Sequence, residues 1–434
     1  MNPQLVKHLG MKLEAASISL LLLYYLGMTG LPEGPINAAS YGILAILITW
    51  RWKRFIYVAT RDIPLLLLLV TAVASIFWSA APAFTINEMK TLLRAMFLGV
   101  YLATRYRIED LVRIFLWVFG IAVILSLLTA LALPAYGTHG GGWSSPWKGI
   151  FGYKNALACV ATIAAMLFLL TAITRRRQRW VALGGFGIAA ALVLFSQSKS
   201  GLSVFLILLF LWPLYKLVKQ HYKLRVVLLL IAILLGGIVA ILLLSNLETI
   251  VVDGLGKDLE FNGRIPIWNI IIEKGLERPW LGYGYVGFWT SDAGLFIVYH
   301  SWASEGHGDV TARFNSHNAF IDLFVQLGWV GLSLYLLNLM ILFFKVISLL
   351  FITKKIEFFW IIQFILSMIL YSLSDSVMGT ILTPSSFWTI YVSIALSVAL
   401  EQKRILKKNF FEKRFHQSRF RLLKLVKNRE NIIC

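Results

Sequence analysis

Five ionisable residues border or interrupt the apolar segments of this sequence, and their types suit the binding of a phosphorylated group. They are Lys154, Lys199, Arg264, His317 and Asp375. Ionisable side chains are costly inside a bilayer, so each of them requires a partner, a cavity or a ligand. Three cations facing one compartment would suit a pyrophosphate, because Arg offers a forked donor to phosphate oxygens and Lys offers a point charge.

Each of these residues also has a simpler explanation when it is taken alone. Lys154 and Lys199 could be lysines that snorkel from helix ends toward water. Asp375 could cap a helix or neutralise one of the cations. His317 could be a structural histidine with satisfied hydrogen bonds, and Arg264 a headgroup anchor. The functional interpretation therefore rests on the predicted position of all five on the same side of the membrane.

His317 has the sequence context of a general base. It follows Asn315 and Ser316, which are good helix-capping residues, and an apolar segment begins near Ala319. A helix N-terminus disfavours additional positive charge, so this imidazole is expected to stay neutral and able to accept a proton. We expect Asn318, the next residue, to support it.

Six tryptophans lie in two long loops between the apolar segments, at positions 143, 147, 268, 280, 289 and 302. Aromatic faces of this kind can stack on sugar rings. Tryptophan is equally typical of the belts at membrane interfaces, so the sequence leaves both interpretations open.

Metal chemistry has little support in the sequence. His300, His307, Asp309 and His317 follow no spacing of a known metal motif, and the Gly-rich segment between them imposes no geometry. The two cysteines of the chain provide neither a disulfide framework nor a cysteine-based metal site. No serine lies on a nucleophile-elbow motif. The sequence therefore predicts no metal and no other cofactor.

The composition indicates the architecture that must position these residues. Of 434 residues, 59% are hydrophobic and only 14% are charged, whereas soluble domains are about one quarter charged. The sequence predicts an all-α, polytopic integral membrane protein with about 12 transmembrane helices. We expect them near residues 15–30, 38–50, 63–80, 91–104, 111–133, 156–173, 180–197, 201–215, 226–245, 319–344, 358–374 and 383–400.

The distribution of charge predicts the orientation. With the N-terminus inside, every predicted cytoplasmic connection is basic and most of the acidic residues lie outside, as the positive-inside rule requires. This arrangement assigns the net charge of +20 to the membrane surface and argues against a nucleic-acid partner. Residues 1–12 lack the apolar core of a signal peptide, so we expect the first helix to remain in the mature protein.

Two predicted external loops are long, at 134–155 and 246–316, and long loops carry function more often than short ones. The second loop includes a predicted short helix from Arg264 to Leu276 that stops before Pro279. We interpret residues 1–400, including both large external (periplasmic) loops, as one transmembrane domain.

Residues 401–434 form a basic cytoplasmic tail in which Lys and Arg alternate with Phe and Leu. Such a tail could bind a specific partner. The simpler interpretation is an interfacial helix or arm attracted to anionic lipid headgroups, because each basic residue near that surface contributes about 1 kcal/mol.

Three motifs in fixed order resemble a known family. The sequences SQSKSG, FNGRIPIW and FNSHNAFIDLFVQLGWVG are similar to those of the O-antigen ligase and polymerase superfamily of bacterial surface-polysaccharide assembly. WKGIFGYKNALA resembles a motif of exopolysaccharide-polymerase-like members, and YSLSDS resembles a polar patch of the ligases. The resemblance covers residues 140 to 380.

The resemblance implies an enzyme of the inner membrane that takes a glycan from undecaprenyl pyrophosphate and joins it to an acceptor hydroxyl at the periplasmic face. It implies no metal and inversion at the anomeric carbon. By this resemblance His317 matches the histidine that activates the acceptor, and Arg264 matches an arginine that engages the diphosphate. Lys199 stands where most members have Arg, which keeps the charge but loses the fork. Lys154 and Asn155 match the upstream motif, and Asp375 matches an acidic position of the ligases.

The sequence leaves several alternatives open. The acceptor could be a glycolipid such as a lipid A core, as in a ligase, or another lipid-linked glycan, as in a polymerase. A membrane transporter or flippase of the cell envelope is the rival class, because polar residues in polytopic proteins often line a permeation path. A transporter should place its ionisable groups near the bilayer midplane, whereas here they gather toward one face. A structural scaffold is a third alternative.

Overall fold

The computed structural model describes residues 3–30, 32–220, 264–299, 314–374, 380–383 and 385–408. These residues form helices and loops, with isolated β-bridges only. Up to residue 220, the described helices are α1 (Pro3–Tyr25), α2 (Glu33–Trp50), α3 (Trp52–Ala59), α4 (Ile63–Ala74), η1 (Ser75–Phe77), α5 (Pro82–Arg105), α6 (Ile108–Ala132), α7 (Pro134–Gly137), α8 (Lys154–Thr174), η2 (Arg176–Gln178), α9 (Arg179–Phe195) and α10 (Lys199–Gln220).

The second half of the chain contributes fewer helices to the described part. They are α12 (Arg264–Glu277), α13 (Asp292–Tyr299), α14 (Ala319–Thr353), α15 (Glu357–Ser374) and a further helix over residues 386–408. The predicted all-α class is confirmed for the described residues. The predicted helix from Arg264 to Leu276 is also confirmed, since α12 spans nearly the same residues and ends just before Pro279.

Among the residues that the structure describes, five helices are long and apolar enough to cross a membrane, or six if the bent pair α3 and α4–η1 counts as one span. The prediction of about 12 spans is therefore only partly supported. The predicted segment 226–245 lies outside the described residues. Those at 38–50 and 201–215 fall in α2 and α10, whose apolar parts are shorter than a full span. That at 63–80 belongs to the bent pair.

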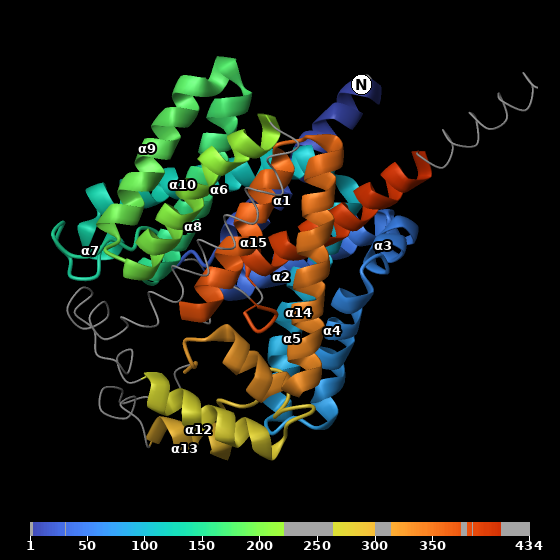
Figure 1. Cartoon of the computed structure of the whole chain (residues 1–434), viewed down its shortest axis with the longest axis vertical. Coiled ribbons are helices and arrows are strands. Elements are labelled where there is room, and N and C mark those ends of the chain that lie inside the picture. Colours follow the sequence, from blue (N-terminus) through green and yellow to red (C-terminus); the bar gives the residue numbers. More distant parts are fainter. Residues whose placement is uncertain are drawn as a thin grey trace, which may run out of the picture.

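Helix α8 forms the centre of one half of the molecule. In its apolar stretch 83% of residues are buried, against 22% for the span at Arg176–Phe195, so α8 is enclosed by protein while α9 faces outward. It packs against α6, α9, α10 and α15 (Figure 1). Its many alanines suit this position, because small residues let membrane helices approach closely.

Helix α14 is broken near its N-terminal end at Gly328, whose φ of 65° and ψ of −169° are not helical. A Cβ at this position would lie 2.2 Å from the backbone carbonyl carbon of Trp280, so only glycine fits here. The preceding loop fills the break with backbone hydrogen bonds, since Trp329 N donates to Pro279 O and Gly284 N donates to Gln326 O. Residues 319–327 therefore form a separate half-helix, close to α12 and α13 in Figure 1.

The orientation predicted from charge can be tested with three exposed positions. Trp143 precedes α8, Arg177 follows it and Thr290 lies between α12 and α13. Cysteines at positions 143 and 290 should react in intact cells with a thiol reagent that does not cross membranes, and a cysteine at 177 should react only after the membrane is opened. Labelling of position 177 in intact cells would contradict the predicted orientation.

Candidate functional site

His317 lies in a tight turn directly before α14. Its backbone N donates to the Asn315 side-chain oxygen at 2.9 Å, and its φ of 54° is in the left-handed region. Within the same turn the Ser316 hydroxyl donates to the Asn318 carbonyl at 2.7 Å and accepts from the Asn318 N at 3.0 Å. These bonds hold the half-buried imidazole at the entrance of the helix, as the sequence predicted.

Asn318 is the residue that caps α14. Its side-chain oxygen accepts from the backbone N of Phe320 and of Ile321. The sequence favoured Asn315 and Ser316 as caps, and that assignment is wrong by two to three residues. Both residues instead shape the turn before the cap. The predicted supporting role of Asn318 thus has a structural basis, because the N-cap fixes where the helix begins.

Asp322 anchors the turn from inside the first part of α14. Its carboxylate is only 2% exposed and accepts the backbone N of Ser316 at 3.2 Å and the indole N–H of Trp289 at 3.0 Å. Trp268 of α12 donates its indole N–H to the Ser316 carbonyl at 2.7 Å. Trp268 of α12 and Asp322 of α14 therefore both bind the residue before His317, and Trp289 in turn binds Asp322.

A cluster of aromatic side chains packs around Trp289 and supports these contacts. Trp289 packs edge-on against Phe288 and against Phe314, with ring centroids 4.9 and 5.0 Å apart. Ile267, Ile271 and Val325 are buried in the same cluster, so α12 and the half-helix of α14 share one small core. The turn that carries His317 consequently lies on packed elements, which would hold a functional side chain in place.

Four of the tryptophans of the loops divide into two groups, and the fifth described one, Trp268, is half-buried against the His317 turn. Trp147 and Trp289 are 5% and 9% exposed, and Trp147 stacks on Phe195 at 4.6 Å, so their ring faces are used inside the protein. Trp143 and Trp280 are 66% and 70% exposed and remain available for sugar stacking or for the membrane interface. Trp302 lies outside the described residues.

Lys154 and Lys199 occupy equivalent positions in two neighbouring helices, since Lys154 is the first residue of α8 and Lys199 is the first residue of α10. The Ser198 hydroxyl donates to the Asn155 side-chain oxygen at 2.8 Å and joins the two helix starts. The motifs SQSKSG and YKN, which are more than 40 residues apart in the chain, are thus brought together. Two helix N-termini with a lysine each form a favourable environment for an anion.

Loop residues reinforce the meeting of these helices. Trp147 N donates to the Phe195 carbonyl at 3.0 Å, and Gln197, whose φ is 51°, donates from its side chain to the Ser144 carbonyl at 3.2 Å. The first long loop therefore lies against the end of α9 and the turn into α10. These contacts hold the starts of α8 and α10 in place relative to one another.

His139 is a residue of this region that the sequence interpretation missed. Its Nε2 accepts the backbone N–H of Lys154 at 3.0 Å, so it caps α8 in place of the usual Ser or Asp. Partial burial, together with Lys148 and Lys154 nearby, lowers the pKa of His139 below its usual value. The neutral imidazole is therefore the form that binds the helix, and protonation on acidification would remove the bond. The only signal in the sequence is its place in the loop motif THGGGW.

Two predicted site residues remain, Arg264 and Asp375. Arg264 is the first residue of α12, one helical turn before Trp268, which places its backbone on the element that holds the His317 turn. The side chain of Arg264 is not described. Asp375 lies outside the described residues, as do His300, His307 and Asp309.

The role assigned to Asp322 can be tested by substitution. Asp322→Ala would leave the Ser316 N–H and the Trp289 indole N–H buried without an acceptor, and each such group costs about 1–3 kcal/mol. We expect faster hydrogen exchange over residues 314–322 and a loss of activity, with smaller effects for Asp322→Asn, which keeps one oxygen. Normal exchange protection in Asp322→Ala would show that the turn is held by other contacts.

Comparison with known proteins places these contacts in a family. A family model described as O-antigen ligase matches residues 184–336. This range includes Lys199, Arg264, His317 and the half-helix of α14, whereas Lys154 lies before it. The chain is also 25% identical over 311 residues to a protein of Rhizobium meliloti (strain 1021) that is named exopolysaccharide production protein ExoQ, with 70% of each chain covered.

These two matches confirm the predicted relationship to the O-antigen ligase and polymerase superfamily. The chain is accordingly similar to the O-antigen ligase family over residues 184–336, and to the exopolysaccharide protein along most of its length. The matched range contains the ordered motifs around Lys199, Arg264 and His317.

Proposed function

We propose that this protein is a glycosyltransferase that transfers a glycan from undecaprenyl pyrophosphate to the hydroxyl of an acceptor glycan or glycolipid. The observation that carries this proposal is the His317 turn, which lies inside the range matched by the O-antigen ligase model and whose Ser316 is bound by Trp268 of α12 and by Asp322 of α14. We further propose that the protein resides in the bacterial inner membrane and that the site faces the periplasm, as the charge distribution predicts.

In this mechanism His317 accepts the proton of the acceptor hydroxyl. The acceptor oxygen then forms a bond to the anomeric carbon, and the bond from that carbon to the phosphate oxygen breaks. Undecaprenyl pyrophosphate leaves with the electron pair, and attack from the opposite face inverts the anomeric carbon. General base catalysis of this type contributes about 10²- to 10⁴-fold to the rate.

Cations stabilise the departing pyrophosphate. Lys154 and Lys199 contribute point charges at two helix N-termini, and Arg264, at the start of α12, contributes a forked donor. The membrane lipid tail of the donor would enter between helices, which leaves its diphosphate at the level of the helix ends. The enzyme then mainly orients the acceptor and stabilises charge on phosphate.

A ligase and a polymerase of this class differ in the acceptor that they use. The relative's name, which refers to exopolysaccharide production, supports a polymerase that joins lipid-linked repeats, and the family description supports a ligase. The surface glycan of a deletion strain distinguishes them. Single repeats that remain attached to the final carrier would indicate a polymerase, and accumulation of lipid-linked polymer would indicate a ligase. A strain with unchanged glycans would contradict both.

We propose that the reaction requires no metal. Turnover by the purified protein should therefore persist in an excess of chelator, because the lysines and Arg264 provide the positive charge that a metal would otherwise contribute. Loss of activity on chelation, with recovery on adding one specific divalent ion, would contradict this proposal. It would direct attention to His300, His307 and Asp309.

A further inference from the structure

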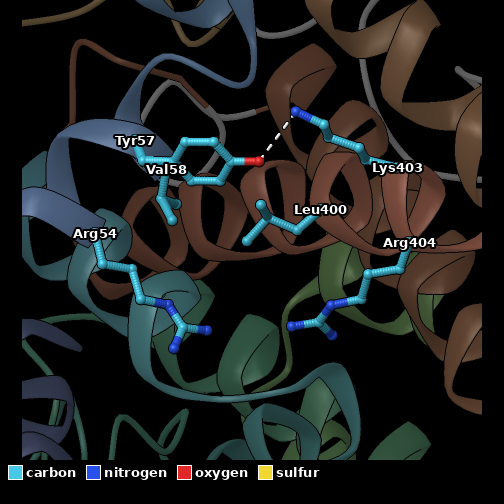
Figure 2. A pocket seen from close by; sticks show the side chains of 6 residues that line it. All are labelled: Arg54, Tyr57, Val58, Leu400, Lys403 and Arg404. Atoms are coloured by element: carbon cyan, nitrogen blue, oxygen red, sulfur yellow. Dashed lines mark hydrogen bonds between the residues drawn. The ribbon is translucent and has the colours of Figure 1, made fainter. Parts of the chain in front are cut away.

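A basic pocket lies between α3 and the helix over residues 386–408, away from the contacts of His317. Its volume is about 150 Å³, and Figure 2 shows its lining: Arg54, Tyr57 and Val58 from α3, and Leu400, Lys403 and Arg404 from the other helix. About 10–15 Å³ of such volume holds one water, so the pocket has room for a phosphate group and several waters.

The charges that line the pocket are unbalanced. The guanidinium groups of Arg54 and Arg404 point toward the space between them from opposite helices (Figure 2). Glu401 accepts from Arg404 at 3.1 Å, but it also contacts Lys355 at 3.5 Å, so its charge is shared with a residue outside the pocket. Two like charges that face one another repel unless an anion lies between them.

Lys403 and Tyr57 complete a set of donors. The Lys403 ammonium donates to the Tyr57 hydroxyl at 3.0 Å, which leaves its other two protons for further acceptors. This bond also joins α3 to the other helix. Two forked guanidinium groups and an ammonium group match the oxygens of a phosphate, which accept several hydrogen bonds at once.

The position of α3 indicates where the anion would come from. The pair α3 and α4–η1 is bent by 96°, so α3 runs across the direction of the helix that follows it. Trp52 and Ile56 are each 54% exposed, while Lys53 and Arg54 lie on the same short helix. Exposed Trp and Ile beside basic residues are typical of a helix that lies at the membrane interface.

Two apolar residues give the pocket the character of a lipid site. Val58 and Leu400 line it next to the cations, and both belong to the packed face between the two helices. A lipid headgroup presents a phosphate next to the first methylenes of its chains, which fits cations beside apolar side chains. Basic pockets between helices at the side predicted to be cytoplasmic are suited to anionic lipids.

We propose that this pocket binds the phosphodiester group of an anionic membrane lipid. The bound lipid thereby links the helix over residues 386–408 to α3. The phosphate lies between Arg54 and Arg404, with Lys403 as a third donor. The bound lipid neutralises the repulsion between the two guanidinium groups and holds the start of the basic tail, which carries Lys403 and Arg404, at the membrane surface.

The full-length protein can be tested in nanodiscs of phosphatidylethanolamine, with and without phosphatidylglycerol. Native mass spectrometry after detergent extraction should find phosphatidylglycerol retained on the wild type. The double variant Arg54→Gln/Arg404→Gln should bind it roughly tenfold to a hundredfold more weakly, because it loses two charge-assisted contacts. The matched control Lys53→Gln/Lys408→Gln removes the same charge from the same helices at residues that do not line the pocket, and it should retain the lipid.

Three outcomes would overturn the proposal. One is equal retention of phosphatidylglycerol by the wild type and the Arg54→Gln/Arg404→Gln variant. Another is an equal loss in the Lys53→Gln/Lys408→Gln control, which would indicate general surface attraction. The third is complete displacement of the lipid by inorganic phosphate, which would indicate a site for a soluble anion. The conservative variant Arg54→Lys/Arg404→Lys keeps the charge and should bind with intermediate strength, which separates loss of the site from misfolding.

Discussion

A His317→Asn variant is expected to transfer glycan about 10²- to 10⁴-fold more slowly than the wild type while it still folds and binds the donor. The expected size of the effect is that of a lost general base. Asparagine is the replacement that the structure favours, because His317 has a φ of 54° and Asn adopts this left-handed conformation more readily than most residues. Its backbone N can also keep the bond to Asn315.

Comparison with His317→Ala separates the loss of the base from the effect of backbone strain in the turn. Alanine in this conformation costs about 1–2 kcal/mol, so any extra instability of the Ala variant reports on the turn and not on the base. The rate of the wild type should also fall on acidification, since a protonated imidazole cannot accept the acceptor's proton. Single-turnover transfer and donor affinity are the measurements. Full activity in His317→Asn would remove this residue from the mechanism.

The second large effect is expected for the paired lysines. A Lys154→Ala/Lys199→Ala variant should bind the lipid-linked donor roughly tenfold to a hundredfold more weakly, because each lysine contributes a charged contact at a helix N-terminus. The two residues begin helices that the Ser198–Asn155 bond joins, so their effects should not be additive. A double-mutant cycle on donor affinity measures this coupling.

Two further variants complete the lysine experiment. Lys199→Arg should retain activity, because it restores the residue that most family members are expected to have at this position. Lys274→Ala is a suitable control, since Lys274 pairs with Glu277 at 2.7 Å on the exposed surface of α12. Donor affinity that is unchanged in the Lys154→Ala/Lys199→Ala variant would show that both lysines only reach toward water.

The sequence predicted those elements that begin or end at a change in polarity. The ends of α12 follow from the polar residues before Arg264 and from Pro279 after the helix, and the start of α14 follows from the change from Asn-Ser-His-Asn to apolar residues. The same reasoning identified His317 at the helix entrance. It also identified Lys154 and Lys199 as polar residues at the ends of apolar segments.

The contacts that assemble the site were beyond such reasoning. Asp322 lies inside the predicted apolar segment 319–344, where hydropathy gives it no role, although its carboxylate holds the His317 turn. His139 caps α8 from a loop, and no local spacing indicates that bond. The break at Gly328 is invisible to hydropathy because glycine does not interrupt an apolar run. Its partners are backbone groups of residues 279–284, which carry no side-chain signature.

The break at Gly328 also determines how segments of this protein can be exchanged with those of its relatives. Residues 279–284 and 325–330 interlock through backbone bonds, and Gly282 lies so close to Gln326 that a Cβ would come within 2.5 Å of the Gln326 carbonyl carbon. A chimaera that exchanges the long loop alone would separate two halves of one interlocking unit. The exchangeable cassette is instead the stretch from α12 through the half-helix of α14, with its junctions outside residues 264–330.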